Sequence, residues 1–202
     1  PEHLSLYALT LEPETPLGKA VNAGKIPAPD DDVAADMYEL AEALLAGAGY
    51  RHYEISNWAK PGRECRHNLV YWHNGEYYGF GAAAHSSLKG HRLANTADID
   101  GYIFTGGNTL EMDECLSPAM KQAETIILGL RLSDGIDIRE VKERFGIDIM
   151  QEYVKPLWSM IEIGMLERED NHIRLTPRGR LLSNEVFWRL LPEEEPAEVM
   201  KN

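Results

Sequence analysis

The stretch DDDVAADMYELAEALLAGAGYRHYEIS, residues 30–56, contains the clearest regular pattern in the sequence. Its apolar residues recur at helical spacing, on a stripe formed by Val33, Met37, Leu40 and Leu44. Aspartates at the front of the stretch suit the positive end of a helix, and Gly49 suits the position just after its last turn. The pattern therefore predicts a helix that is followed by a strand over residues 50–56.

A strand is also expected before this helix, because apolar residues alternate with other residues over positions 3–9. Between the two, Thr15 and Pro16 have the form of a helix cap and a first helical residue, which predicts a short helix that ends at Gly24. Strand, helix and strand in this order favour two parallel strands joined by a right-handed crossover. The fold class indicated for this part of the chain is α/β.

The second half of the chain has a different order of elements. Helix starts are indicated at Ser117, Asp137, Asp148 and Thr176. The helix that begins at Asp148 is expected to kink at Pro156, whose nitrogen cannot donate a hydrogen bond. Residues 166–176 are expected to form a hairpin that turns at Asp170 and Asn171.

Three helices, a hairpin and a final helix make a mostly helical, winged-helix-like order. We therefore predict two domains, one over residues 1–110 and one over residues 111–191. An acidic tail, residues 192–202, is expected to be disordered.

Composition and charge limit the classes of partner. Of the 202 residues, 44% are apolar and 26% are charged, which fits a globular protein and excludes wholesale disorder. The formal net charge of -13 would repel a phosphate backbone, so no nucleic acid partner is expected. No apolar run approaches ~18 residues and no leader pattern opens the sequence, so we expect a cytoplasmic protein.

The two cysteines, Cys65 and Cys115, lie far apart and in no paired motif. This spacing excludes a disulfide framework, and it excludes a cysteine-based zinc or iron–sulfur site contained within this chain. Two reduced thiols are expected.

Imidazole and aromatic side chains gather in HNLVYW, residues 67–72. A histidine such as His67 can ligate haem iron, and the rings of Tyr71 and Trp72 could cover the macrocycle. A single histidine in a loop is more often a hydrogen-bonding residue without a ligand. From the spacing alone, both interpretations stay open.

Two further patterns allow a functional and a structural interpretation. The small-residue run GFGAAAHS, residues 79–86, would let a ligand approach backbone amides closely, but it also suits a tightly packed barrel strand. His52 and Glu54 are expected to point the same way along a strand, near Asn57. They could serve acid–base or metal chemistry, or form a surface ion pair.

The sequence resembles the HemN/HemW branch of the radical SAM proteins over nearly its whole length. The similarity is carried by four stretches: LSLYALTLEPETPL (residues 4–17), DDDVAADMYELAEALLAGAGYRHYEISNWAKPG (30–62), RHNLVYWHNGEYYGFGAAAHS (66–86) and LTPRGRLLSNEVF (175–187). The branch includes oxygen-independent coproporphyrinogen III oxidases and related haem chaperones. The resemblance implies that residues 1–110 are the C-terminal section of a partial TIM-like barrel, and that the helical domain encloses a tetrapyrrole.

Within this branch, HNxxYW marks the haem chaperones. It is complete here as His67, Asn68, Tyr71 and Trp72. The resemblance therefore implies a C-terminal fragment of a chaperone that binds haem, with His67 on the iron, and delivers it to haem-requiring acceptor proteins. The alternative is a fragment of an oxidase that acts on coproporphyrinogen III in haem biosynthesis.

The family also binds S-adenosylmethionine beside a [4Fe–4S] cluster held by CxxxCxxC, a motif that this sequence lacks. We therefore expect the chain to be inactive alone in radical chemistry. The resemblance implies that Thr10 and His85 face S-adenosylmethionine in a longer parent protein. A barrel that is cut through its sheet would expose a strand edge near residues 3–9, and self-association is one way to cover it.

Overall fold

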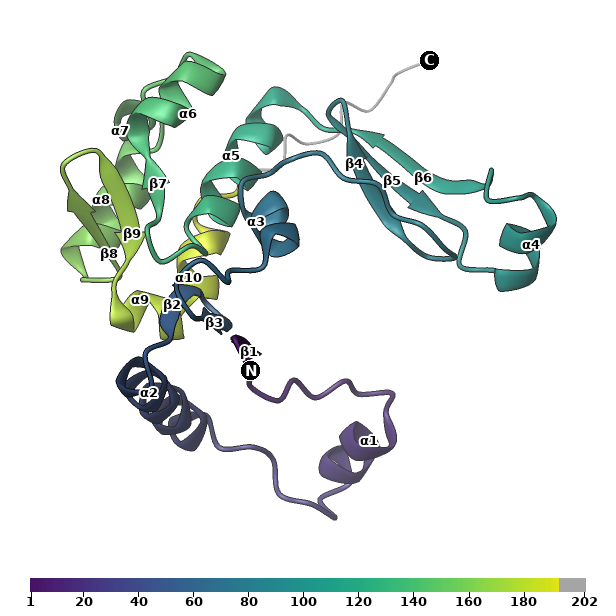
Figure 1. Ribbon diagram of the computed structural model, residues 1–202, viewed down its shortest axis with the longest axis horizontal. Helices are drawn as coiled ribbons and strands as arrows, with labels where there is room; N and C mark the ends of the chain where they lie inside the picture. Colours follow the sequence, from purple (N-terminus) through teal and green to yellow (C-terminus); the bar gives the residue numbers. More distant parts are fainter. Residues whose placement is uncertain (193–202) are drawn as a thin grey trace, which may run out of the picture. The chain divides into compact units, whose positions relative to one another are not determined.

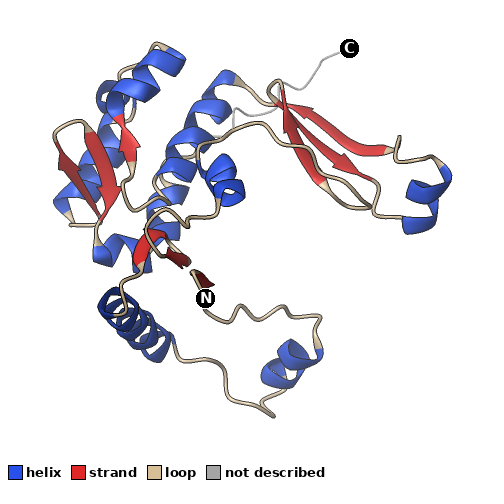
Figure 2. Cartoon of the chain, in the orientation of Figure 1, coloured by secondary structure: helices blue, strands red, loops and turns tan. Residues whose placement is uncertain are grey.

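The computed structural model describes residues 1–192 and contains both helices and sheets (Figures 1 and 2). The chain divides into two compact units after Cys65. We refer to residues 1–65 as unit 1 and to the described residues from 66 onward as unit 2, and we describe each by itself. The domain boundary near residue 110 stays a prediction, and the predicted acidic tail lies outside the described residues except for Pro192.

Unit 1 contains β1 (His3–Ser5), α1 (Pro16–Asn22), α2 (Asp31–Gly47), β2 (Arg51–Glu54) and β3 (Asn57–Ala59). Its sheet has the order β1-β3-β2, and both outer strands pair antiparallel with β3. Because β1 and β2 are both antiparallel to β3, they run in the same direction, as the crossover pattern predicts.

The two strands do not pair directly, because β3 lies between them. Trp58 and Ala59 of β3 are almost completely buried, at 1% and 0% exposure. The central position of a sheet is the most enclosed one, so the short apolar segment takes it. The sequence around them favours a polar loop, since three residues are too few to show a strand-like alternation.

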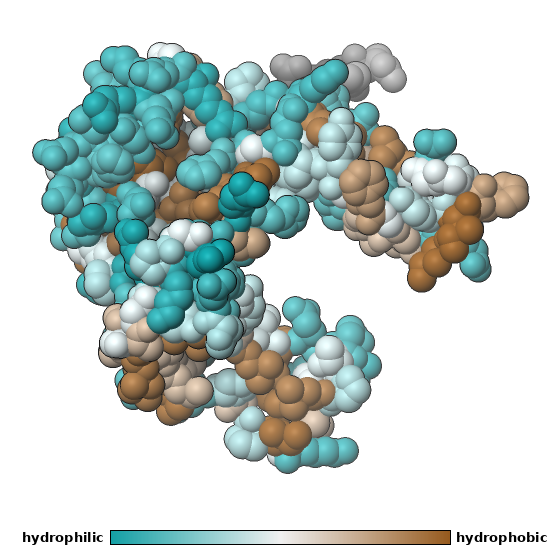
Figure 3. Space-filling model, viewed as in Figure 1, coloured by the Kyte–Doolittle hydropathy of each residue, from teal (hydrophilic) through white to brown (hydrophobic). Residues whose placement is uncertain are grey.

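Helix α2 begins where the sequence indicates. The side chain of Asp30 accepts hydrogen bonds from the backbone nitrogens of Asp32 and Val33, at 2.9 and 3.1 Å. The apolar stripe of this helix nevertheless remains exposed within unit 1: Val33 53%, Met37 65%, Leu40 60% and Leu44 63%. Figure 3 shows apolar side chains at the surface over this helix. The described residues of unit 1 therefore leave the stripe uncovered.

Unit 2 opens with α3 (Arg66–Trp72), β4 (His85–Leu88), β5 (His91–Asn95), α4 (Ile99–Phe104) and β6 (Leu110–Cys115). The three strands form an antiparallel sheet in the order β4-β5-β6. Helix α4 lies at the far end of this sheet, in the connection between β5 and β6 (Figure 1).

The rest of unit 2 contains α5 (Pro118–Gly129), β7 (Ile136–Asp137), α6 (Ile138–Phe145), α7 (Ile149–Glu152), α8 (Val154–Glu162), β8 (Leu166–Glu169), β9 (His172–Leu175), α9 (Pro177–Leu181) and α10 (Ser183–Trp188). A second antiparallel sheet has the order β7-β9-β8. Ile126 of α5, Leu157 of α8 and Ile173 of β9 are completely buried and belong to the core of this part.

The local signals for these elements are confirmed. All four predicted caps accept a hydrogen bond from a backbone nitrogen in the first turn: Ser117, Asp137, Asp148 and Thr176. The predicted kink is present as a break at Tyr153, between α7 and α8. Pro156 explains the break, because it has no N–H to donate to the carbonyl of residue 152. The hairpin of β8 and β9 turns at Asp170, whose φ is 51°.

Among residues 1–192, none of the helices has the length and apolar character that crossing a membrane requires.

Candidate functional site

The HNLVYW motif lies on a helix, whereas the sequence interpretation had placed it in a loop. Helix α3 begins at Arg66 and ends at Trp72, and it packs against α5. Residues four apart on a helix are neighbours on one face. The motif is therefore divided into two pairs, His67 with Tyr71 and Asn68 with Trp72.

The first pair joins an exposed histidine to a half-buried tyrosine by a hydrogen bond. His67 is exposed, and its Nε2 atom lies 2.8 Å from the hydroxyl oxygen of Tyr71. The two rings meet edge to face, with centroids 4.8 Å apart and an interplanar angle of 76°. The imidazole is thus open to solvent and held on one side by a phenol.

A third ring extends this pair. Tyr77 meets Tyr71 edge to face, with centroids 4.6 Å apart and an interplanar angle of 83°. The sequence interpretation did not include Tyr77. A turn of the main chain at Asn74 and Gly75 brings it back to α3, and the Gly75 in HNGEYY is the signal that could have indicated this turn.

Beside the tyrosines lies a hollow of about 290 Å³. Tyr71, Tyr77 and the ion-paired side chains of Arg92 and Glu124 contribute to its lining, whereas His67 does not. Pockets that enclose a drug-sized ligand usually measure ~300–1,000 Å³. This hollow is therefore too small to enclose a tetrapyrrole.

The second pair of the motif faces the interior of unit 2. The guanidinium carbon of Arg131 lies 4.5 Å from the centroid of the Trp72 ring, and the same guanidinium lies 6.0 Å from the ring of Phe187. The indole nitrogen of Trp72 is buried and has no hydrogen-bond partner among the described residues. Trp72 therefore packs α3 onto the helical part of unit 2, and Asn68 is half-buried beside it.

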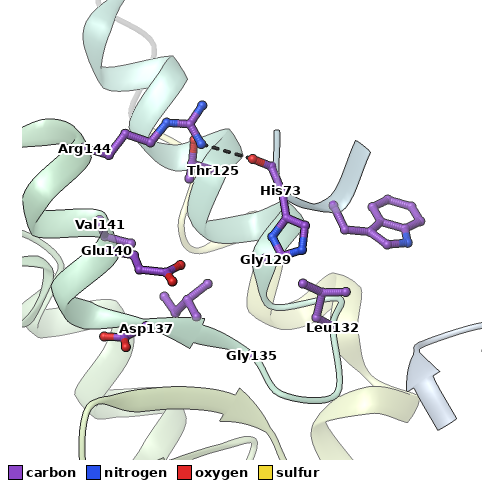
Figure 4. A pocket seen from close by; sticks show the side chains of 11 residues that line it. His73, Thr125, Gly129, Leu132, Gly135, Asp137, Glu140, Val141 and Arg144 are labelled. Carbon is purple, nitrogen blue, oxygen red and sulfur yellow. Dashed lines mark hydrogen bonds between the residues drawn. The ribbon is translucent and has the colours of Figure 1, made fainter. Parts of the chain in front are cut away.

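Trp72 and His73 also line a smaller cavity of about 100 Å³ between α3, α5 and α6 (Figure 4). Arg144 closes one side of it by donating a hydrogen bond of 3.1 Å to the carbonyl oxygen of His73. The carboxylates of Asp137 and Glu140 lie on the α6 side. This cavity has room for a few water molecules but not for a tetrapyrrole.

The candidate S-adenosylmethionine contacts lie in different units. Thr10 is exposed and follows β1 in unit 1, whereas His85 is exposed and begins β4 in unit 2. Their proposed role therefore stays a prediction.

The small-residue run uses its backbone amides internally. Gly79 donates to the hydroxyl of Ser86 at 2.9 Å, and Gly81 donates to the hydroxyl of Tyr102 at 3.0 Å. A Cβ atom on Gly79 would lie 2.1 Å from the carbonyl oxygen of His85. These contacts favour the interpretation of close packing over that of an open ligand cradle.

The expected pairing of His52 with Glu54 is wrong. A β-bulge falls between the two residues and changes their alternation. The Nδ1 atom of His52 lies 3.4 Å from a carboxylate oxygen of Glu42, and its ring stacks on Trp58 at 4.3 Å. Glu54 is completely buried and accepts hydrogen bonds from the amide of Asn57 and the backbone nitrogen of Ser56.

An iron–sulfur cluster of the CxxxCxxC type does not fit this chain. The sequence has two cysteines, and both are free thiols. Within residues 1–192, no three His, Cys, Asp or Glu side chains come together in a way that could hold a metal ion.

Comparison with known proteins places these features in a family. Residues 116–182 match the HemN C-terminal domain. The curated relatives include several proteins named heme chaperone HemW. The Bacillus subtilis protein is 34% identical over 95% of this chain and 52% of its own length, and the Mycobacterium tuberculosis H37Rv protein is 37% identical over 94% and 47%. The chain thus spans about half the length of the curated relatives it matches, and the match lies in their C-terminal part.

One solved structure has a similar fold. The radical SAM enzyme coproporphyrinogen III oxidase (HemN) from Escherichia coli superposes with a TM-score of 0.74 over 95% of this chain and 48% of that chain. The sequence identity is 17%, so this likeness shows a common fold with mixed helix and sheet.

Proposed function

Because this chain belongs to the HemN/HemW branch of the radical SAM proteins, whose C-terminal part it matches, we propose that it contributes the haem-binding residues of a haem chaperone. The observation that carries the proposal is the complete HNLVYW motif on α3, with the imidazole of His67 exposed. Both the HemW-named relatives and the geometry of this pair support a carrier of haem. The likeness to the oxidase structure concerns the fold alone and adds no second candidate.

In this proposal, His67 supplies the ligand to the haem iron and Tyr71 lies against the macrocycle. An exposed imidazole suits a carrier, because the iron must also leave its ligand when haem passes to an acceptor protein. Trp72 has an indirect role, since it packs α3 against Arg131 and keeps the helix in place. Asn68 shares the face of Trp72 and belongs to the same support.

Further parts of the proposal concern the longer parent protein. We place residues 1–110 in the C-terminal section of a TIM-like radical SAM barrel and residues 111–191 in a winged-helix-like domain. Thr10 and His85 would face S-adenosylmethionine, and the [4Fe–4S] cluster would be held outside this sequence. The free side of β1, which pairs with β3 alone among the described strands, would be covered in the parent or by self-association. A cytoplasmic location and haem-requiring acceptors also belong to this proposal.

The test is a haem titration followed by the Soret band. We expect His67→Ala to weaken haem binding by at least about tenfold and to change the Soret maximum, because the iron loses its protein ligand. The titration should be made with this chain and with the full-length parent. Transfer to a haem-free acceptor protein, followed in the same spectra, then tests delivery.

His73→Ala is the matched control. His73 is an exposed histidine one residue beyond α3, and its contact with Arg144 uses its backbone carbonyl rather than its ring. Its substitution should leave haem binding unchanged. Equal haem affinity and equal spectra for the wild type and His67→Ala would refute the proposal.

A further inference from the structure

We infer that Tyr77, which lies outside the HNxxYW motif, is a positioning residue that fixes the imidazole of His67 through Tyr71. The significance of this inference for haem rests on the proposed function. The arrangement of the three rings can be tested without haem.

The ring of His67 is held in one orientation by Tyr71. An exposed histidine near the start of a helix samples several rotamers unless a neighbour holds it. Here the hydroxyl of Tyr71 lies 2.8 Å from Nε2, and the ring of Tyr71 stands edge-on to the imidazole. One hydrogen bond and one ring contact therefore select a single orientation of the imidazole.

Tyr71 is itself held between two rings. Its ring is in contact with His67 at 4.8 Å and with Tyr77 at 4.6 Å. Edge-to-face ring pairs contribute ~0.5–1.5 kcal/mol beyond the area that they bury. Tyr71 already lines the neighbouring hollow, so without Tyr77 its ring has room to rotate away from His67.

Tyr77 is held by backbone hydrogen bonds to Ser87. Its backbone nitrogen donates to the carbonyl of Ser87 at 3.0 Å, and the nitrogen of Ser87 donates to the carbonyl of Tyr77 at 3.0 Å. Ser87 is buried in β4, the edge strand of the β4-β5-β6 sheet. Tyr77 is thus fixed to a sheet, and the row Tyr77, Tyr71, His67 transmits that position to α3.

The hydrogen bond has a consequence for iron binding. A neutral imidazole carries one proton, and the partner of one nitrogen decides which nitrogen is free to bind a metal. If Nε2–H donates to the Tyr71 oxygen, Nδ1 is available to iron. If the Tyr71 hydroxyl donates instead, iron must displace it from Nε2. In both cases Tyr71, held by Tyr77, sets the tautomer that haem meets.

The first test measures the ¹⁵N NMR signals of the His67 ring in the haem-free chain. At alkaline pH these signals report which ring nitrogen carries the proton. We expect one dominant tautomer in the wild type and a mixture in Tyr77→Ala and in Tyr71→Phe. Tyr77→Phe keeps the ring contact and should retain the wild-type spectrum. Tyr78→Ala is the matched control, because Tyr78 is an exposed neighbour that stacks on Phe80 instead.

A haem titration of the same variants completes the test. Tyr77→Ala should weaken haem binding by about tenfold and alter the Soret band, while Tyr77→Phe and Tyr78→Ala bind as the wild type does. If the wild type binds no haem but Tyr77→Ala still shifts the tautomer, the positioning role stands and the proposed function fails. If the wild type binds haem through His67 and Tyr77→Ala changes neither readout, the inference is overturned.

Discussion

At the scale of single residues, Asp137 makes two interactions with Arg139. Its carboxylate pairs with the Arg139 guanidinium at 2.9 Å and accepts the backbone N–H of Arg139 at 2.8 Å. The side-chain hydrogen bond and then the backbone hydrogen bond lower the pKa of Asp137 from 3.8 to about 2. The carboxylate is therefore an N-cap that remains charged well into the acidic range.

The lowered pKa predicts a specific pH dependence. The charge of Asp137 stabilises the folded chain fully above the unfolded pKa of 3.8, and this contribution is lost as the pH falls through the folded pKa of about 2. Asp137→Asn keeps an oxygen for the cap but removes the charge. We expect its urea midpoint to lie below that of the wild type above pH 3.8 and to converge with it near pH 2. A difference that does not change with pH would contradict this account.

At the scale of elements, two helices require a glycine for different reasons. Gly146 ends α6 with a φ of 70°, and a Cβ atom there would meet no atom within 4 Å. Gly179 in α9 lies so close to the residue that precedes β8 that a Cβ atom would be 1.9 Å from the carbonyl oxygen of Met165. The first glycine is needed for its backbone angle alone, and the second is needed for space.

This difference predicts unequal effects of alanine. Gly146→Ala should lower the free energy of unfolding by ~1 kcal/mol, the cost of a left-handed residue with a side chain. Gly179→Ala should cost at least about twice as much, because the backbone of α9 must move away from residue 165. Urea unfolding of both variants measures the two costs. Equal costs would mean that the approach of α9 to β8 relaxes easily.

At the scale of the whole molecule, the apolar stripe of α2 is left uncovered by the described residues of unit 1, whereas Ala123 and Ile126 of α5 are completely buried within unit 2. Replacing Leu40 and Leu44 with glutamine should change the free energy of unfolding by less than ~0.5 kcal/mol per residue, as exposed positions do. Ile126→Ala in α5 should cost ~2–5 kcal/mol, because Ile126 is completely buried. Urea unfolding provides both measurements.

The same exposed stripe should bind an apolar dye. We expect the fluorescence of 8-anilinonaphthalene-1-sulfonate to be enhanced by this chain and reduced by the double glutamine substitution on α2. The Ile126→Ala variant, compared under fully folded conditions, should keep the wild-type signal. An unchanged signal in the α2 variant would show that the dye binds elsewhere.

Features that depend on a few neighbouring residues can be predicted from the order of amino acids. Helix caps, the break before Pro156 and the turn at Asp170 follow from hydrogen bonds and backbone angles within about four positions of each residue. The HNLVYW motif and the resemblance to the family can also be recognised from the sequence, because both depend on the identity and order of residues.

The contacts between distant segments become visible once the chain is folded. The fold placed β3 between β1 and β2, turned Glu54 inward and away from His52, and brought Tyr77 against Tyr71. These outcomes depend on competition between segments for buried positions, and on a bulge and a turn that redirect the chain. The spacing of apolar residues along the sequence indicates an amphipathic helix, but the fold decides whether its apolar side is buried, as exposed Leu40 of α2 and buried Ile126 of α5 illustrate.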